Sequence, residues 1–239
     1  MSRVYAFGAV PLGENRPSSS PRSTSPEGPW NFREWPSLTV MSSRETTVPG
    51  FKVEWLTLKE GLLYVGSSGD AAMPQTLWVK TVNDRGEVRH LDWTENWRGI
   101  VAALGLDLKQ GLRVESVQWS AVHNRWFLLT KRARPAEGGK KQAIRKIVTA
   151  DEEFQDFHVT EVEGAVDHDK CFTDMFFLPG SQDSIIVALQ ATETSQRCSK
   201  RCNFTSHLSI FTTGGVEILQ PTQFSANAKY EGLIVRKIE

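Results

Sequence analysis

Short apolar runs alternate with turn-forming residues along most of the chain, beginning near Phe51. Runs of this length, with polar and apolar side chains alternating and Gly, Asn or Asp between them, predict β-hairpins. The predicted hairpins pair 54–58 with 62–66, 76–82 with 88–92, 114–120 with 125–130, 173–178 with 184–190, and 208–212 with 216–219. No helix alternates regularly with these strands. The pattern therefore predicts an all-β fold.

One helix interrupts the strands after residue 92. Asp92 precedes the helical run and Glu95 follows three positions later, an arrangement close to a capping box. Within the run, apolar side chains recur at helical spacing at Trp97, Ile100, Val101 and Leu104. Gly105 is a typical C-terminal stop. We expect this helix to pack on the flank of the β-structure.

A polar residue recurs at the same place in a repeated pattern of strands. Glu54, Glu115 and Glu231 each lie in a short apolar or aromatic run, and Thr173 occupies the same position in the repeat. The intervals are 61 (115−54), 58 (173−115) and 58 (231−173) residues. A fixed period of this kind is the signature of repeated β architectures. In a β-propeller the innermost strands face one central channel, so same-phase side chains converge there.

Three carboxylates gathered in one channel repel each other and resist burial unless a cation lies between them. Carboxylate and hydroxyl oxygens are the ligands that calcium and magnesium prefer. The period therefore predicts a cation site formed by Glu54, Glu115, Thr173 and Glu231. The alternative is structural: each glutamate is a buried acceptor paired with a neighbouring cation or backbone amide. Asp174 either faces the channel beside Thr173 or points to the opposite side of its strand.

Charge and hydropathy weaken several other classes of function. The 239 residues contain 28 Lys and Arg and 28 Asp and Glu, a formal net charge of zero. A neutral chain of this kind argues against a nucleic-acid or polybasic membrane surface. No apolar run approaches the roughly 20 residues of a membrane-spanning helix. The first residues also lack the apolar core of a secretory signal.

The N-terminal part differs in composition from the rest. Seven of the eleven prolines lie in the first 50 residues, mixed with serine. Such a segment buries too little apolar surface to offset the entropy of ordering it. We therefore expect a disordered leader at 1–48 and a folded β domain at 49–239. Of the three cysteines, Cys198 and Cys202 are able to pair in an oxidising compartment. Asn203 begins a glycosylation sequon.

Several of these strings resemble the calcium-activated nucleotidase (apyrase) family, in the same order along the chain. The resemblance covers about Val48 to Val235. The strings are GFKVEWL at 50–56 with LYVG at 63–66, WVK at 78–80, ES at 115–116 with WS at 119–120 and RWF at 125–127, SIIVAL at 184–189, and KYEG at 229–232.

The resemblance implies a five-bladed β-propeller with one calcium ion in the central channel. It implies calcium-dependent hydrolysis of nucleoside di- and triphosphates, with UDP and GDP as frequent substrates. The family's calcium ligands on the inner strands correspond to Glu54, Glu115, Thr173 and Glu231. Lys131 and Arg132 resemble a family Arg-Arg pair, and we expect them to clamp the substrate phosphates.

The chain also departs from the family pattern. Five inner strands are expected and four are found, so we expect an incomplete ring of about four blades. The family's Asp-rich loop, which contributes to the calcium and phosphate site, has no counterpart in this chain. Lys131 stands where the family has arginine, and lysine lacks the bidentate fork of a guanidinium group.

Three functions follow from these observations. The first is a calcium-dependent nucleotide phosphatase, in which Glu115→Gln abolishes calcium binding with little loss of folding. The second is a catalytically inactive propeller that binds calcium or a protein partner. The third is a propeller without metal, whose central glutamates are structural. Family members are secreted or reside in the endoplasmic reticulum and Golgi, and a homodimer is possible.

Overall fold

The computed structural model describes residues 2–8, 51–164, 167, 169–192, 204–226 and 228–237, with side chains described from Phe51 to Leu233 within these ranges. Most of the predicted leader, and Cys198, Cys202 and Asn203, therefore lie outside the described residues. The described part is built from antiparallel strands with few helices, which confirms the predicted all-β class.

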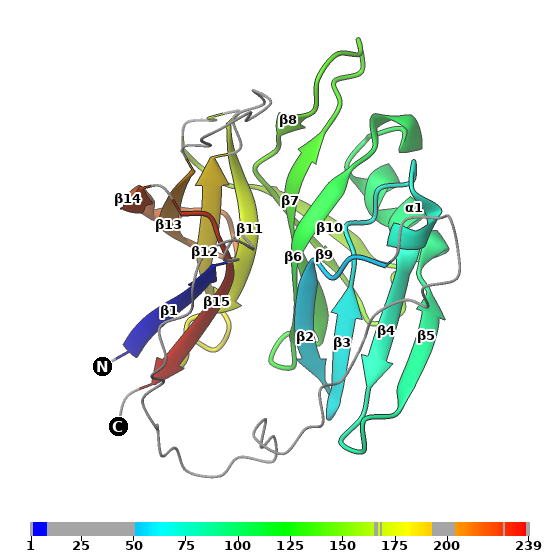
Figure 1. The fold of residues 1–239 in the computed structure, drawn as a ribbon, viewed down its shortest axis with the longest axis horizontal. Helices are drawn as coiled ribbons and strands as arrows, with labels where there is room; N and C mark the ends of the chain where they lie inside the picture. Colours follow the sequence, from blue (N-terminus) through cyan, green and yellow to red (C-terminus); the bar gives the residue numbers. More distant parts are fainter. Residues whose placement is uncertain are drawn as a thin grey trace, which may run out of the picture.

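The strands form three large sheets and one pair (Figure 1). The first sheet contains β2 (Trp55–Lys59), β3 (Leu62–Gly66), β4 (Trp78–Val82) and β5 (Val88–Asp92), in that order. The second has the order β6 (Arg113–Ser120), β7 (Arg125–Ala133), β9 (Lys146–Ala150) and β10 (Phe157–Glu161), with β8 (Gln142–Ala143) beside β7. The third contains β11 (Lys170–Phe177), β12 (Ile185–Thr192), β13 (Thr205–Thr212) and β14 (Glu217–Ala226). β1 (Ser2–Gly8) pairs with β15 (Tyr230–Lys237).

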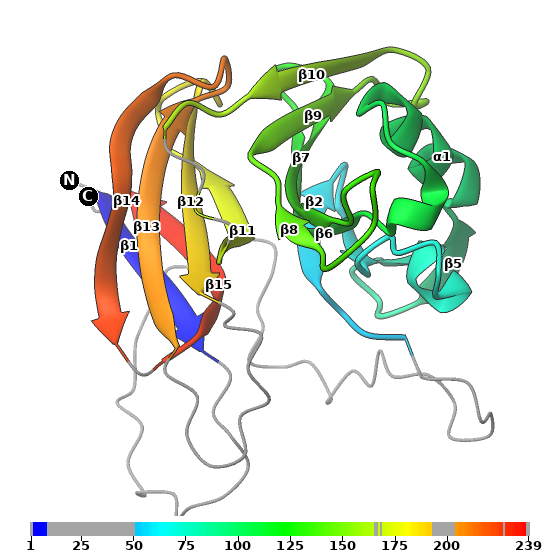
Figure 2. The same cartoon turned by 90° about the horizontal axis from the view of Figure 1, so that it is seen from above.

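The first strand of each large sheet lies at an edge, and these edges meet. β2 contacts β6, β6 contacts β11, and β11 contacts β15. Seen from above, the sheets follow one another around this inner line of strands (Figure 2). Among the described strands, none of the sheets closes on itself. The repeated hairpins of the sequence thus place four equivalent strands side by side.

An aromatic core joins the first two sheets to the helix α1 (Thr94–Ala103). Trp93 packs between Trp55 and Trp126, with ring centroids 5.6 and 5.2 Å away. The helix adds its buried Trp97, Ile100 and Val101 to the same cluster, as the helical spacing predicts. These indoles are therefore core residues, which agrees with their aromatic context in the sequence.

The C-terminal end of α1 follows its sequence signal, whereas the capping box suggested by Asp92 and Glu95 does not form: the N-cap is Trp93, and Glu95 pairs with Arg98. The Asp92 carboxylate accepts hydrogen bonds from the Thr94 amide (2.9 Å) and the Thr94 hydroxyl (2.6 Å). These bonds fix the turn that leads into the helix, one residue before its N-cap Trp93. Gly105 ends the helix with φ of 68°, a left-handed backbone conformation that glycine adopts without strain.

The structure differs from the predicted strands in three places. Residues 74–77 form a 3₁₀ turn, because Pro74 starts it and the Thr76 hydroxyl donates to the Met73 carbonyl (2.8 Å). β9 and β10 extend the second sheet beyond its predicted hairpin. Residues 2–8 form β1 within the stretch expected to be a leader.

Candidate functional site

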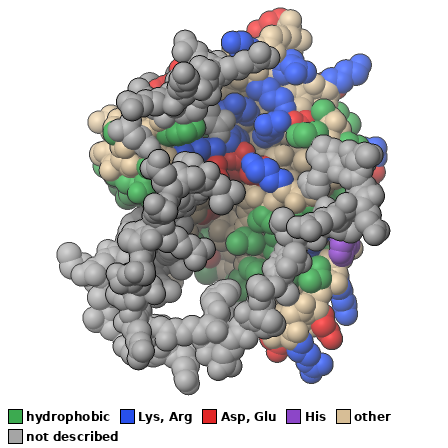
Figure 3. Space-filling view, in the orientation of Figure 1, with side chains coloured by type: hydrophobic (Ala, Val, Ile, Leu, Met, Phe, Trp, Pro, Cys, Tyr) green, Lys and Arg blue, Asp and Glu red, His purple; other side chains and the backbone are tan. Residues whose placement is uncertain are grey.

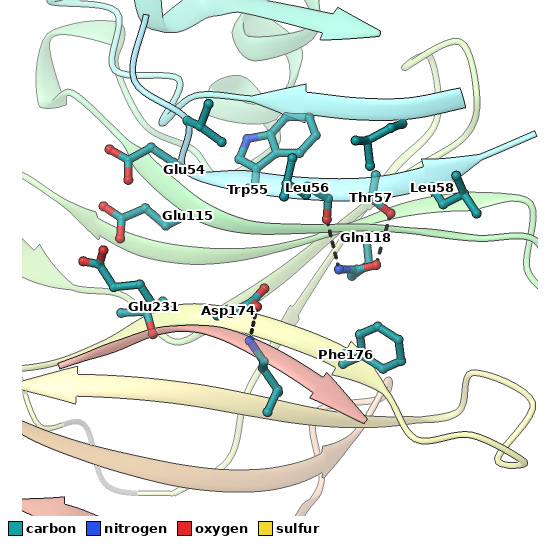
Figure 4. A pocket seen from close by; sticks show the side chains of 15 residues that line it. Glu54, Trp55, Leu56, Thr57, Leu58, Glu115, Gln118, Asp174, Phe176 and Glu231 are labelled. Carbon is teal, nitrogen blue, oxygen red and sulfur yellow. Dashed lines mark hydrogen bonds between the residues drawn. The ribbon is translucent and has the colours of Figure 1, made fainter. Parts of the chain in front are cut away.

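The four residues selected by the period line one cavity of about 650 Å³ between the inner strands (Figure 4). Glu54 lies just before β2, Glu115 on β6, Thr173 on β11 and Glu231 on β15. In Figure 4 the three carboxylates point to the same end of the cavity. Residues that are 177 positions apart in sequence (231−54) therefore share one site.

Three of these residues are the extra residue of a β-bulge. The pairing of β6 with β7 passes from Val114 to Ser116 and skips Glu115. The pairing of β11 with β12 skips Thr173, and the pairing of β15 with β1 skips Glu231. A bulge turns one side chain away from the regular alternation of the strand. Each bulge here falls at a residue that lines the cavity. We call the end where the carboxylates of Glu54, Glu115 and Glu231 gather the acidic end.

Glu54 has a related backbone arrangement. Its amide donates to the Gly66 carbonyl (2.9 Å), although Trp55 is the residue that faces Gly66 in the register of β2 and β3. Glu54 and Trp55 thus both stand opposite Gly66, as two residues stand opposite one in a β-bulge. Gly66 is required here because an added Cβ would lie 1.8 Å from the Trp55 ring. The Trp55 indole also donates to the Ser67 carbonyl (2.8 Å), which anchors the residue next to Glu54.

Each glutamate forms an ion pair with a lysine. The pairs are Lys52–Glu54 (2.8 Å), Lys131–Glu115, and Lys229–Glu231 (2.5 Å). The Lys131–Glu115 pair is the most deeply buried, with side chains 4% and 9% exposed. Lys52, in contrast, is largely exposed. The positive charge that three clustered carboxylates require is thus supplied by ammonium groups in this structure.

The carboxylates and lysines act on each other across the cavity. Burial raises the pKa of Glu54, the charge of Glu115 adds to this rise, and Lys52 opposes it. Burial alone would lower the pKa of Lys52, but Glu54, Glu115 and Glu231 outweigh it and raise that pKa. Burial favours a higher pKa for Glu231, yet Lys229 and the other lysines bring it below its usual value. The acidic end is therefore one coupled electrostatic unit.

Thr173 and Asp174 bind the backbone of β15 beside Glu231. The buried Thr173 hydroxyl donates to the Tyr230 carbonyl (3.2 Å), and the Asp174 carboxylate accepts from the Leu233 amide (2.7 Å). Asp174 faces the cavity, the first of the two orientations expected for it (Figure 4). Burial raises the pKa of Asp174 to about 7, against the opposing effect of two backbone hydrogen bonds.

The two residues of the expected phosphate clamp, Lys131 and Arg132, have different partners in the structure. Lys131 forms an ion pair with Glu115, whereas the Arg132 guanidinium donates to the Cys171 thiol sulfur (2.9 Å). The pairing of β6 with β7 passes from Arg132 to Thr130 and skips Lys131, so Lys131 departs from the regular alternation of β7. Figure 3 shows Lys and Arg side chains gathered around a small acidic group on this face of the molecule.

The other end of the cavity is apolar. Leu56 and Leu58 of β2 are 50% and 48% exposed, and Phe176 of β11 faces them (Figure 4). Gln118 of β6 lies between the two ends, where its side chain accepts from the Thr57 hydroxyl (3.1 Å). Exposed leucines on an inner strand are unusual, and the sequence alone did not indicate them.

The donor chemistry of the acidic end suits calcium, and each of its carboxylates is paired with a lysine in this structure. Among the described residues, no three His, Cys, Asp or Glu side chains stand together in metal-ligand geometry. The three glutamates nevertheless share one cavity and one electrostatic field. Oxygen donors of this type are calcium ligands. Glu54, Glu115, Glu231 and Thr173 are therefore the candidate residues for such an ion.

Comparisons with known proteins point to one family. The Apyrase family model matches residues 31–235. The chain is 33% identical over 196 residues to soluble calcium-activated nucleotidase 1 of Rattus norvegicus, covering 77% of this chain and 47% of the relative. It is 31% identical to an apyrase of Cimex lectularius (77% and 52% covered) and 29% identical to apyrase apy-1 of Caenorhabditis elegans (78% and 54% covered).

The chain spans about half the length of the curated relatives it matches. The matched residues include the three glutamates of the acidic end and the lysine paired with each, namely Glu54, Glu115, Glu231, Lys52, Lys131 and Lys229. In the described part of the chain, no helix has both the length and the apolar character needed to span a membrane.

Proposed function

Because this chain belongs to the apyrase family, we propose that it hydrolyses nucleoside di- and triphosphates, such as UDP and GDP, in a calcium-dependent reaction that releases phosphate. The observation that carries this proposal is the convergence of Glu54, Glu115 and Glu231 from separate strands on one cavity. The names of the relatives support nucleotidase activity. The calcium dependence and the preferred nucleotides are part of the proposal.

The proposed scaffold is a β-propeller with an incomplete ring. Three antiparallel sheets of at least four strands, each presenting its first strand to a common line, support this architecture. β15 supplies the fourth inner strand, with β1 as its partner. The inner strands of a propeller line a central channel, which matches the position of the cavity.

Glu54, Glu115, Glu231 and the oxygen of Thr173 would hold the calcium ion. When bound, the ion supplies positive charge to the phosphoryl oxygens and orients them for attack by water. The three carboxylates and three ammonium groups of the acidic end carry no net charge together. A bound divalent cation would therefore leave the cavity positively charged and attractive to a polyphosphate.

The lysines and Arg132 would then hold the substrate. Lys52 and Lys229 precede their glutamates by two residues, and the exposed Lys52 is free to turn from the carboxylate to a phosphate. Lys131 and Arg132 are the proposed clamp on the phosphoryl group, and Arg132 would have to turn from Cys171 to take part. Arg132 offers the bidentate geometry that phosphate oxygens match best.

The proposal also covers the cellular compartment of the protein and its assembly. The relatives named soluble nucleotidase support a secreted or lumenal protein, in the endoplasmic reticulum or the Golgi. The substrate is the expected partner, and we propose neither a nucleic-acid nor a membrane-spanning role. A homodimer is a further possibility, which sedimentation of the purified chain would test.

The direct test is phosphate release from UDP, GDP and ADP by the purified chain, first with calcium and then with excess chelator. We expect release that stops on chelation. Arg132→Ala should slow release, because it removes a phosphate-binding cation. Arg98→Ala is the matched control, since Arg98 is an exposed arginine of α1 paired with Glu95. Release that is unaffected by chelator would contradict the proposal.

One observation favours a second candidate, an inactive propeller that binds calcium or a protein partner. The lysines already balance the charge of the three carboxylates, so the acidic end has counter-charges without an ion. The exposed Leu56 and Leu58 would suit an apolar partner. Absence of phosphate release under every cation tested, with a folded and monodisperse chain, would favour this candidate.

A further inference from the structure

The strand that carries Glu231 is attached to the molecule in an unusual way. β15 pairs with β1, and in the described part of the chain it joins no other strand ladder. It nevertheless packs against β11 and β12 of the third sheet. Among the described residues, its hydrogen bonds to that sheet involve side chains of the sheet, and these bonds flank Glu231.

Two neighbouring residues of β11 bind β15 on both sides of Glu231. The Thr173 hydroxyl donates to the Tyr230 carbonyl (3.2 Å), one residue before Glu231. The Asp174 Oδ2 atom accepts from the Leu233 amide (2.7 Å), two residues after it. Because Glu231 itself is skipped in the pairing with β1, the regular ladder does not fix its side chain.

A third side chain supports the same segment from β13. The buried Ser206 hydroxyl accepts from the Tyr230 amide (3.0 Å) and donates to the Ala228 carbonyl (2.9 Å). This contact lies entirely before Glu231. Asp174 is therefore the side chain that holds the segment after the bulge, among the residues that the structure describes.

Both oxygens of Asp174 are occupied by the main chain. Oδ1 accepts from the Met175 amide (2.8 Å), and Oδ2 accepts from Leu233. A carboxylate used in this way is a poor candidate for direct contact with an ion or substrate. It is well suited to fix the distance between β11 and β15.

We propose that Asp174 is a positioning residue that sets Glu231 for ion binding by holding the Leu233 amide. This inference rests on the proposed calcium site. Outer-sphere partners of metal ligands typically change affinity by roughly 10–100-fold when removed. Asp174 differs from such partners because it binds the backbone of the strand that carries Glu231, at Leu233, and not the Glu231 side chain.

The test is a double-mutant cycle read by calcium affinity, with calorimetric titration of the full chain. We expect Asp174→Ala to weaken calcium binding roughly tenfold or more. Adding Asp174→Ala to Glu231→Gln should weaken it little further, because both changes act through one ligand. Asp174→Asn keeps one acceptor oxygen and should give an intermediate loss.

Ser120→Ala is the matched control. Its hydroxyl donates to Asp183 (2.8 Å), a bond of similar length that joins β6 of the second sheet to the turn between β11 and β12. Ser120→Ala should leave calcium affinity unchanged even where it lowers stability. Additive losses in the Asp174 and Glu231 cycle, or an unchanged affinity in Asp174→Ala, would overturn the proposal.

Hydrogen exchange in chelator separates this inference from the proposed function. Without calcium, Asp174→Ala should speed exchange of the amides at 230–233, and Ser120→Ala should not. A wild-type chain that binds no calcium would defeat the proposed function. Exchange that stays slow in Asp174→Ala would defeat the positioning role by itself.

Discussion

Glu115 and Lys131 form a buried ion pair at a point where both of their strands leave the regular register. The pairing of β6 with β7 passes from Arg113–Arg132 to Val114–Thr130 and then to Ser116–Leu129, so it skips Lys131 on one strand and Glu115 on the other. Glu115 lines the cavity, and Lys131 binds it. The pair links the proposed ion site to the proposed phosphate clamp.

This pair changes the expected behaviour of Glu115→Gln. The sequence suggested loss of calcium binding with little loss of folding. In the structure, the variant deprives the buried Lys131 ammonium of its carboxylate, and breaking such a pair costs about 3 kcal/mol. We therefore expect a free energy of unfolding lower by about this amount, measured by urea denaturation.

The double variant Glu115→Gln/Lys131→Met is the control for that measurement. Removing both charges avoids leaving a buried ammonium group without the Glu115 carboxylate, so most of the lost stability should return. A Glu115→Gln variant as stable as the wild type would show that the pair does not form in solution.

Gly66→Ala should disturb the backbone beside Glu54. The added methyl group would fall 1.8 Å from the Trp55 ring, which is itself packed against Trp93. Overpacking of this kind costs roughly 1–3 kcal/mol. The prediction is a lower midpoint of unfolding and a shifted tryptophan emission. Gly214→Ala should change neither, since its nearest neighbour would be 3.5 Å away.

Asp70 provides a pH-dependent prediction. Its carboxylate binds Lys141 (2.6 Å) and Arg113 (3.1 Å), two residues before Glu115. Burial alone would raise the pKa of Asp70, but Lys141 and Arg113 outweigh it and lower the pKa below its usual 3.8. The stabilisation is therefore present above about pH 4. The stabilisation is lost as the pH falls from 3.8 through the lowered pKa that Asp70 has in the folded protein.

Asp70→Asn tests that sign. At pH 6 the variant should be less stable than the wild type by about 2 kcal/mol, because it loses hydrogen bonds between charged groups. The difference in free energy of unfolding should shrink as the pH is lowered from 4 to 2. A difference that grows on acidification would contradict the assignment.

The sequence predicted the hairpins and the helix well because their signals are local. Glu54, Glu115, Thr173 and Glu231 were found through a period of about 60 residues, which reports the repeat and needs no knowledge of packing. β10 was missed because its strand is short and half exposed, with no clear apolar run. Edge strands of this kind are defined by the neighbour they pair with.

The details of the site were beyond sequence reasoning for a physical reason. A β-bulge depends on the register of two strands, and nothing around Glu115 or Glu231 in the chain reveals that register. The lysine at 131 was expected at the phosphate, yet its ammonium group binds Glu115. Asp174 was noted only as a possible channel residue, since its hydrogen bond to Leu233 joins segments 59 residues apart.

The most direct measurement is a calorimetric titration of calcium into the wild-type chain and into a variant in which Glu54, Glu115 and Glu231 are all glutamine. We predict that the wild type binds one calcium ion per chain and that the triple variant, shown to be folded by circular dichroism, binds none. Wild-type protein that binds no calcium, or a triple variant with unchanged affinity, would contradict the shared ion site.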